Sequence, residues 1–195
     1  MDTRDELVTA VEAAFAVTAH GHDPWADPHP DRTPRDDQYS RVTGGEKWCI
    51  LGARVEAWIV ALTTAGRATV ERDVTARWQV EPGTIITRVD RLVPTRRDAL
   101  AITIGHSRVG EVDAAGITLG VGDPAVCIGW LPDCGCDACD SGSQNELDHL
   151  DRHLLGVVIG AFRLLTRGDR RITVLDGDGW SASGRFGRGD VEAVL

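Results

Sequence analysis

The chain has 195 residues and a formal net charge of −9, with 42% hydrophobic and 26% charged residues. This composition is ordinary for a soluble globular protein. An acidic surface repels nucleic-acid phosphates and anionic lipids, so we expect neither a nucleic-acid partner nor a membrane partner. The longest apolar runs are also far shorter than the ~20 residues that a membrane-spanning helix needs.

The amino-terminal residues predict an amphipathic helix rather than a secretory signal. Thr3 and Glu6 have the spacing of a capping box, and apolar residues then recur at helical spacing as far as Gly21. We therefore expect a peripheral helix over residues 5–20. Because an acidic start of this kind does not fit a signal peptide, we expect a cytoplasmic protein, in which cysteines stay reduced.

Residues 21–41 are predicted to form a proline-rich loop within one domain that spans residues 1–195. Four prolines in this loop exclude a helix and favour extended or turn conformations. A second capping box, Thr43 with Glu46, then begins a predicted helix over residues 46–64. Its apolar side chains recur along one face, which indicates packing against a core.

The middle of the chain alternates apolar and polar residues with the two-residue period of β-strands. Four strands are predicted from this alternation, at residues 85–93, 100–104, 117–121 and 125–130. The pattern of residues 67–80 is ambiguous, and a short strand at residues 68–71 is one interpretation of it. Short polar turns join neighbouring runs, which favours an antiparallel meander with one covered face. Near the end of the chain, residues 172–175 and 180–183 predict a hairpin around the Asp-Gly-Asp-Gly turn at residues 176–179.

A second long helix is predicted over residues 145–167, because leucines and valines recur there at helical spacing. Ser143 and Glu146 form a capping box at its start, and Gly168 follows its end. The sequence therefore predicts an α+β fold. We expect an antiparallel β-meander with two long helices packed on one face and a peripheral amino-terminal helix.

The densest group of reactive side chains lies between the last predicted strand of the meander and this helix. Three cysteines occur there within six positions, and protein zinc sites usually combine four cysteine and histidine ligands. His149 lies near the first turns of the following helix, and Cys127 on the incoming strand is a second candidate for the fourth position. The predicted zinc ligands are Cys134, Cys136, Cys139 and His149.

Three other interpretations of this segment stay open. Cys136 and Cys139 form a C-x-x-C pair between a strand and a helix, the order found in thioredoxin-like folds. Residues 137–148 have some of the oxygen ligands of a calcium loop, although Cys139 stands where an acid is expected. Finally, residues 140–143 offer acceptors to the first N–H groups of the helix, so the segment can also be purely structural.

The run PDCGCDACDSGS, the segment Tyr39-Ser-Arg-Val-Thr, residues 51–58 and residues 179–184 together resemble a family of uncharacterised bacterial proteins of similar length. The resemblance covers most of the chain beyond about Tyr39, and the cysteine run is its most specific part. It implies a bacterial, cytosolic context. It implies no activity, so no catalytic residue is carried over from it.

Familiar catalytic motifs are missing from the sequence, which has no P-loop, no G-x-G-x-x-G after a strand, no H-E-x-x-H and no G-x-S-x-G. We therefore expect a non-enzymatic binding or interaction protein with a structural zinc ion as its only cofactor. Its partner would be an unidentified protein or small molecule. The alternative is a thiol-based redox enzyme, or a metal-dependent enzyme, that uses Cys136 and Cys139.

Overall fold

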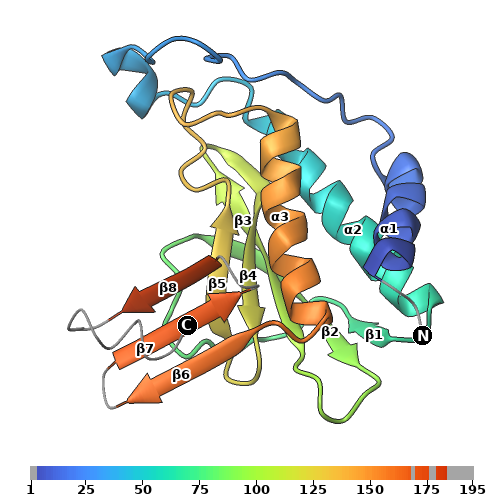
Figure 1. Ribbon diagram of the computed structural model, residues 1–195. Coiled ribbons are helices and arrows are strands. Elements are labelled where there is room, and N and C mark those ends of the chain that lie inside the picture. Colours follow the sequence, from blue (N-terminus) through green and yellow to red (C-terminus); the bar gives the residue numbers. More distant parts are fainter. Residues whose placement is uncertain (1–3, 168–169, 176–178, 184–195) are drawn as a thin grey trace. The chain divides into compact units, whose positions relative to one another are not determined.

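The computed structural model of the protein describes residues 4–167, 170–175 and 179–183 (Figure 1). The chain forms two compact units, Met1–Asp151 and Arg152–Leu195. The boundary between them falls inside a helix, and each unit is described by itself below. The expectation of a single domain over residues 1–195 stays a prediction.

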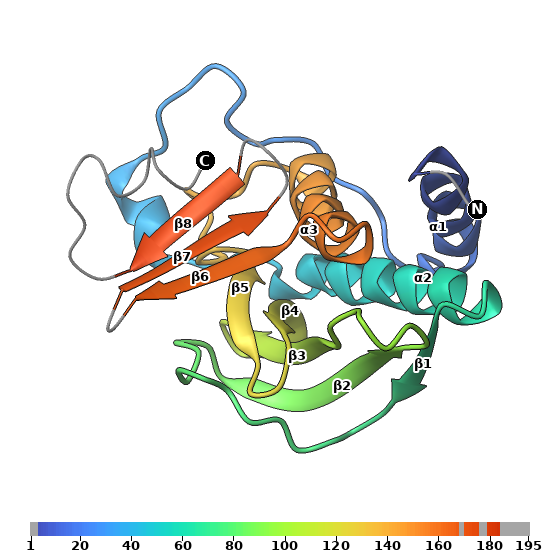
Figure 2. The ribbon, with the colours of Figure 1, turned by 60° about the horizontal axis from the view of Figure 1, so that its bottom comes forward.

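The first unit is built on a five-stranded antiparallel sheet. Its strands are β1 (Ala68–Glu71), β2 (Ile86–Pro94), β3 (Ile102–Val109), β4 (Val112–Val121) and β5 (Val126–Leu131). They lie side by side in chain order, and each pairs with the next in antiparallel fashion. The sheet is therefore the meander that the alternating pattern predicted, with β1 as its fifth strand (Figure 2).

Among the described residues, three α-helices and two short 3-10 helices accompany the strands. They are α1 (Arg4–Thr18), η1 (Asp36–Ser40), η2 (Gly45–Cys49), α2 (Ile50–Thr64) and α3 (Ser143–Val158). The predicted amino-terminal helix is confirmed as α1, and the predicted helix over residues 46–64 is divided between η2 and α2. Helices beside an antiparallel sheet confirm the α+β class. Among the described residues, no helix is long and apolar enough to cross a membrane.

Helix α2 forms the centre of the first unit. Ten of its fifteen residues are buried, because it contacts β1 and β4 of the sheet and α1 from the other side. Trp58 and Leu51 are fully buried core residues of this helix. Helix α1 lies outside α2, where the hydroxyl of Thr18 donates to the backbone oxygen of Ala53 at 2.8 Å. This outer position agrees with the peripheral helix that the sequence predicted.

The segment between β1 and β2 packs against other residues of the sheet. Trp78 forms a bridge with Ala125, and a Cβ added to Gly120 would come within 2.5 Å of the Trp78 ring. The hydroxyls of Thr84 and Thr118 are 2.8 Å apart. Strand β3 lies between β2 and β4, and seven of its eight residues are buried. The expectation of one covered face is wrong for this central strand, whose side chains are buried in both directions.

Helix α3 ends earlier than the predicted range of residues 145–167. Gly160 has φ +81°, in the left-handed region that favours glycine. The N–H of Ala161 donates to Gly156 O at 2.8 Å and that of Gly160 donates to Val157 O at 3.0 Å, which is the Schellman pattern of a helix end. The residues after this stop form a strand, so the predicted helix is wrong beyond Val158.

The second unit contains a three-stranded antiparallel sheet. Its strands are β6 (Arg163–Arg167), β7 (Arg170–Leu175) and β8 (Gly179–Ser183), and β7 lies between the other two. The predicted closing hairpin is confirmed as β7 and β8, and β6 is an additional strand. Residues 176–178 of the predicted turn lie outside the described residues.

Candidate metal centre

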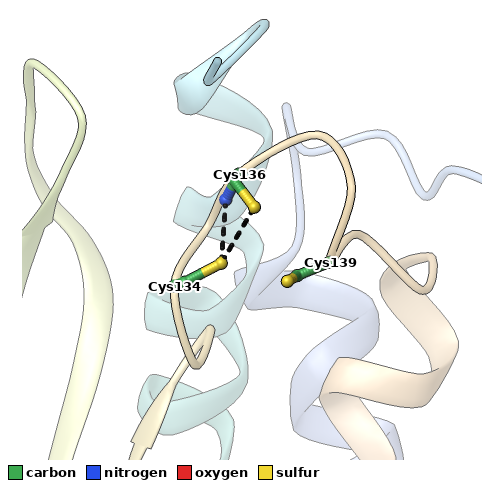
Figure 3. A group of neighbouring side chains, drawn as sticks. All are labelled: Cys134, Cys136 and Cys139. Carbon is green, nitrogen blue, oxygen red and sulfur yellow. Dashed lines mark hydrogen bonds between the residues drawn. The ribbon is translucent and has the colours of Figure 1, made fainter. Parts of the chain in front are cut away.

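The three predicted cysteine ligands lie together in the loop between β5 and α3 (Figure 3). Their Sγ atoms are all within 4.8 Å of one another, and those of Cys134 and Cys136 are 3.0 Å apart. Zn–S bonds of about 2.3 Å place the sulfurs of a tetrahedral site about 3.8 Å apart. Side-chain shifts of roughly 1 Å would therefore bring Cys134, Cys136 and Cys139 into one coordination sphere.

Backbone N–H groups face the sulfur atoms. The N–H of Cys136 donates to Sγ of Cys134 at 3.4 Å. Burial raises the pKa of the Cys136 thiol, but hydrogen bonds from Cys134 and from the backbone of Cys139 and Ala138 outweigh burial and lower it. Donors that favour the ionised sulfur also favour metal binding, because the thiolate is the ligand.

The other two thiols are harder to ionise. Burial and the neighbouring Cys136 raise the pKa of Cys134, and hydrogen bonds to Cys134 and Cys136 raise that of Cys139 to about 12. The three thiols therefore titrate as a group, and each lost proton makes the next harder to remove. A divalent cation would relieve this repulsion and release protons as it binds.

Asp137 attaches one side of the cysteine loop to the proline-rich loop. Its carboxylate accepts hydrogen bonds from Arg41 Nε at 2.7 Å, from the N–H of Thr43 at 2.6 Å and from the Thr43 hydroxyl at 2.7 Å. Burial raises the pKa of Asp137, but Arg41 and Thr43 together lower it to about 2. The backbone oxygen of Asp137 also lies 3.0 Å from Nε2 of His29.

Asp140 attaches the other side of the loop. This buried carboxylate accepts hydrogen bonds from Lys47 Nζ at 2.5 Å and from Trp25 Nε1 at 2.8 Å. The Lys47 ammonium lies over the rings of Trp25 and Trp48, 5.5 and 5.1 Å from their centroids. Asp140 is thus bound to the same folded segment as Asp137, and cations neutralise both carboxylates.

These two anchors weigh against the calcium interpretation, and they reduce the effect of the two acids on ionisation of the cysteines. The oxygens of Asp137 and Asp140 that a calcium ion would need are already bound to Arg41, Thr43, Lys47 and Trp25. An unpaired carboxylate beside a thiol disfavours the thiolate. The charges of Asp137 and Asp140 are paired with Arg41 and Lys47, so this effect on the adjacent cysteines is reduced.

The loop approaches its neighbours so closely that two positions need glycine. Gly135 has φ +71°, and an added Cβ would lie 2.4 Å from Cγ1 of Val109. Gly142 has φ +85°, and its Cβ would lie 2.6 Å from the backbone nitrogen of Asp27. A side chain at either position would both strain the backbone and collide with a neighbour. The sulfur atoms are therefore presented by a tightly packed loop.

Helix α3 gives the thiols no support for redox chemistry. It begins at Ser143, four residues after Cys139, and the field of a helix end falls off within about one turn. A Cys139 pKa near 12 also leaves that thiol protonated at neutral pH. In thioredoxin-like proteins the start of a helix lies beside the attacking thiol and lowers its pKa. Here the start of α3 lies four residues after Cys139.

The fourth ligand stays a prediction. Within the described residues, the group of neighbouring ligand atoms consists of the three cysteines, and His149 on α3 is not a member of it. Cys134 and Cys139 are exposed whereas Cys136 is buried, so solvent reaches the cluster from one side. A tetrahedral site needs a fourth ligand, for which His149 is the residue predicted from the sequence and a water molecule is the alternative.

Glu146 is a partly buried carboxyl group beside the cysteine loop that sequence reasoning treated only as a helix cap. Its Oε1 accepts a hydrogen bond from the Ser141 hydroxyl at 3.4 Å. Burial, together with the nearby charges of Asp133 and Asp140, raises the pKa of Glu146 to about 7, although Ser141 lowers it. The ionised form is therefore disfavoured in the folded protein at neutral pH.

We expect Glu146→Gln to stabilise the protein at pH 8 and to have little effect at pH 5. Because the folded-state pKa is above the unfolded value, the folded state loses stability as pH rises through about 7. After a discount for partial exposure, the gain at pH 8 is roughly 1–2 kcal/mol. Urea unfolding of both proteins at the two pH values measures it. An equal difference at pH 5 and pH 8 would contradict the assignment.

A second polar cluster, which sequence reasoning missed, lies in the sheet. Asp90 on β2 is fully buried, and its Oδ2 lies 2.9 Å from Nε2 of the buried His106 on β3. Arg72 donates to the same oxygen at 2.9 Å, and the N–H of Asp73 donates to Oδ1 at 3.1 Å. Burial lowers the pKa of His106, as does Arg88. Asp90 is surrounded by donors, as expected of a structural buried carboxylate.

Comparison with known proteins places the whole chain in one family. No curated protein and no solved structure matches it. The model of the family described as "Family of unknown function (DUF6226)" matches residues 11–194, which include every described strand and helix except the first turns of α1. This match confirms the resemblance to an uncharacterised family. The chain belongs to this family of unknown function, DUF6226.

Proposed function

We propose that the protein is a non-enzymatic binding or interaction protein in which the cysteine loop holds a structural zinc ion. The observation that carries this proposal is the convergence of three Sγ atoms within 4.8 Å, in a loop whose backbone N–H groups face the sulfurs. Three soft thiolates are a ligand set that zinc prefers. The hard cations calcium and magnesium prefer oxygen ligands.

The anchors of the loop support a structural role for the ion. Asp137 joins the loop to Arg41 and Thr43, whereas Asp140 joins it to Trp25 and Lys47. These partners are 93 to 115 residues away in the chain. An ion bound by the cysteines would fix the conformation of the loop between these two anchors, and so hold Asp137 and Asp140 in place for their distant partners.

A metal-dependent enzyme is the second candidate function. A catalytic zinc ion keeps three protein ligands and one open position for water or substrate, whereas structural sites are closed by four. The geometry brings together three ligands, and two of them are exposed. His149 decides between the two candidates. Closure of the site by this histidine favours the structural role, and a bound water in its place favours catalysis.

Metal analysis of protein purified without a histidine tag tests the proposal. We expect one zinc ion per chain to survive dialysis, because the ligands and their donors are already close together. Serine substitution of Cys134, Cys136 or Cys139 should abolish retention of the ion. The matched controls are Cys49→Ser and Cys127→Ser, since these cysteines are outside the cluster. Metal-free natural protein, or loss of zinc in both controls, would refute the site.

A further inference from the structure

A small polar cavity lies between β2, β3 and the segment that follows β1. Its volume is about 60 Å³, and it is lined by Val74, Thr75, Ala76, Arg77, Arg91, Thr103, Gly122 and Asp123. One water molecule needs roughly 10–15 Å³ of such volume, so the cavity has room for several waters or for one small polyatomic ion. It is separate from the cysteine loop, whose residues do not line it.

Two polar side-chain groups at this cavity have no hydrogen-bond partner among the residues that the structure describes. Nε of Arg91 is buried and has no partner among the residues that the structure describes. Thr103 is the direct cross-strand neighbour of Arg91 and is 3% exposed, and its hydroxyl makes no hydrogen bond within the described part of the chain. Buried donors are nearly always satisfied in native proteins, so the buried Nε of Arg91 indicates an absent acceptor. The Thr103 hydroxyl beside it is not fully enclosed, and it is available to bind the same acceptor.

The charge of the cavity favours an anionic acceptor. Arg77 and Arg91 donate to opposite oxygens of the Asp123 carboxylate, at 3.0 and 3.4 Å. Two guanidinium groups therefore share one carboxylate, which leaves one net positive charge among the lining residues. Asp123 also fixes the orientation of the two arginines. Guanidinium groups with fixed N–H vectors are well suited to oxyanions, which accept several hydrogen bonds at once.

We propose that this cavity binds a small oxyanion, the phosphate or carboxylate group of a metabolite. Arg91 Nε–H and the Thr103 hydroxyl are its specific donors, and Arg77 adds charge at the rim, where its side chain is 73% exposed. This binding is independent of the cysteine loop. The protein would thus recognise a small anionic ligand on its sheet, whatever ion the loop holds.

Titration with inorganic phosphate and with acetate, at constant ionic strength in chloride, tests the proposal by calorimetry. We expect saturable binding of at least one of the two anions, and the tighter one identifies the group recognised. Thr103→Val keeps the shape of the side chain and removes only the hydroxyl, so we expect about tenfold weaker binding in a stably folded protein. Arg91→Lys keeps the charge and removes Nε–H, with a similar loss.

The control is Arg96→Ala, which removes an exposed arginine that pairs with Asp98 and does not line the cavity. It should bind the anion as the natural protein does. Absence of saturable binding of both phosphate and acetate would overturn the proposal. Equal affinity in the natural protein, Thr103→Val and Arg91→Lys would also overturn it, because the anion would then bind elsewhere.

Discussion

Removal of zinc from the cysteine loop is expected to lower the melting temperature by about 10 °C. An ion that binds only the folded state at a thousandfold excess over its Kd adds about 4 kcal/mol to the free energy of unfolding. In a protein of this size each kcal/mol corresponds to roughly 2–4 °C. The cysteine loop contacts the proline-rich loop through Asp137 and Asp140. Loss of the zinc ion should therefore also loosen the proline-rich loop.

Thermal unfolding followed by circular dichroism, with and without EDTA, measures this effect. Cys136→Ser should melt near the temperature of the chelated natural protein, and EDTA should change it no further. The control is Cys127→Ser, which keeps the three-cysteine group and should respond to EDTA as the natural protein does. If EDTA leaves the natural protein unchanged, or shifts Cys136→Ser equally, no ion in this loop stabilises the fold.

Loss of the Arg54 side chain is expected to cost about 3 kcal/mol of unfolding free energy. Arg54 is 4% exposed on α2, and NH2 donates to Glu12 of α1 and to Asp151 of α3, at 2.5 Å in each case. Asp151 also accepts a hydrogen bond from Trp58 Nε1 at 2.7 Å. Breaking a buried ion pair costs about 3–5 kcal/mol, and the lower end applies because Asp151 is partly exposed.

Arg54→Met keeps much of the apolar volume and isolates the loss of the charge and its hydrogen bonds. Urea unfolding of Arg54→Met, Asp151→Asn and the double variant forms a double-mutant cycle. We expect the two single losses to be strongly non-additive, since both remove the same interaction. The control, Arg96→Ala, removes an exposed ion pair and should leave stability nearly unchanged. Additive effects in the cycle would show that Arg54 and Asp151 do not stabilise the protein together.

The part of the fold set by local pattern could be predicted from the sequence. Alternation located strands β2 to β5, although β3 ends five residues after and β4 begins five residues before the predicted range. Helical spacing located α2 and α3, but the predicted capping residues have other partners, because the Thr43 hydroxyl donates to Asp137 and the Ser143 hydroxyl donates to Trp25 O.

The end of α3 could not be placed, because Val157, Ala161 and Leu165 continue the helical spacing through the actual stop. The left-handed conformation of Gly160 ends the helix there. The sequence has a glycine at both 156 and 160 and does not show which of the two adopts this conformation.

The cysteine group could be predicted because its members are close in the chain. The residues that orient it could not, since Trp25 and Arg41 reach the loop across 115 and 96 residues. Aspartates beside cysteines looked unfavourable in isolation, and only the tertiary contacts show that their charges are paired. The buried Asp90 had a sign that was overlooked. Asp90 and Leu92 are two residues apart in a predicted strand, so they lie on the same face of it. Leu92 is buried, which indicates that Asp90 is buried as well.

X-ray absorption at the zinc edge tests the central claim most directly, on protein purified without a tag. The account predicts about three sulfur neighbours at about 2.3 Å, with one nitrogen or oxygen neighbour completing the shell. That fourth neighbour should change in His149→Ala if the histidine closes the site. A shell made only of nitrogen and oxygen atoms, in protein that retains zinc, would mean that the ion is bound elsewhere and that the cysteines do not hold it.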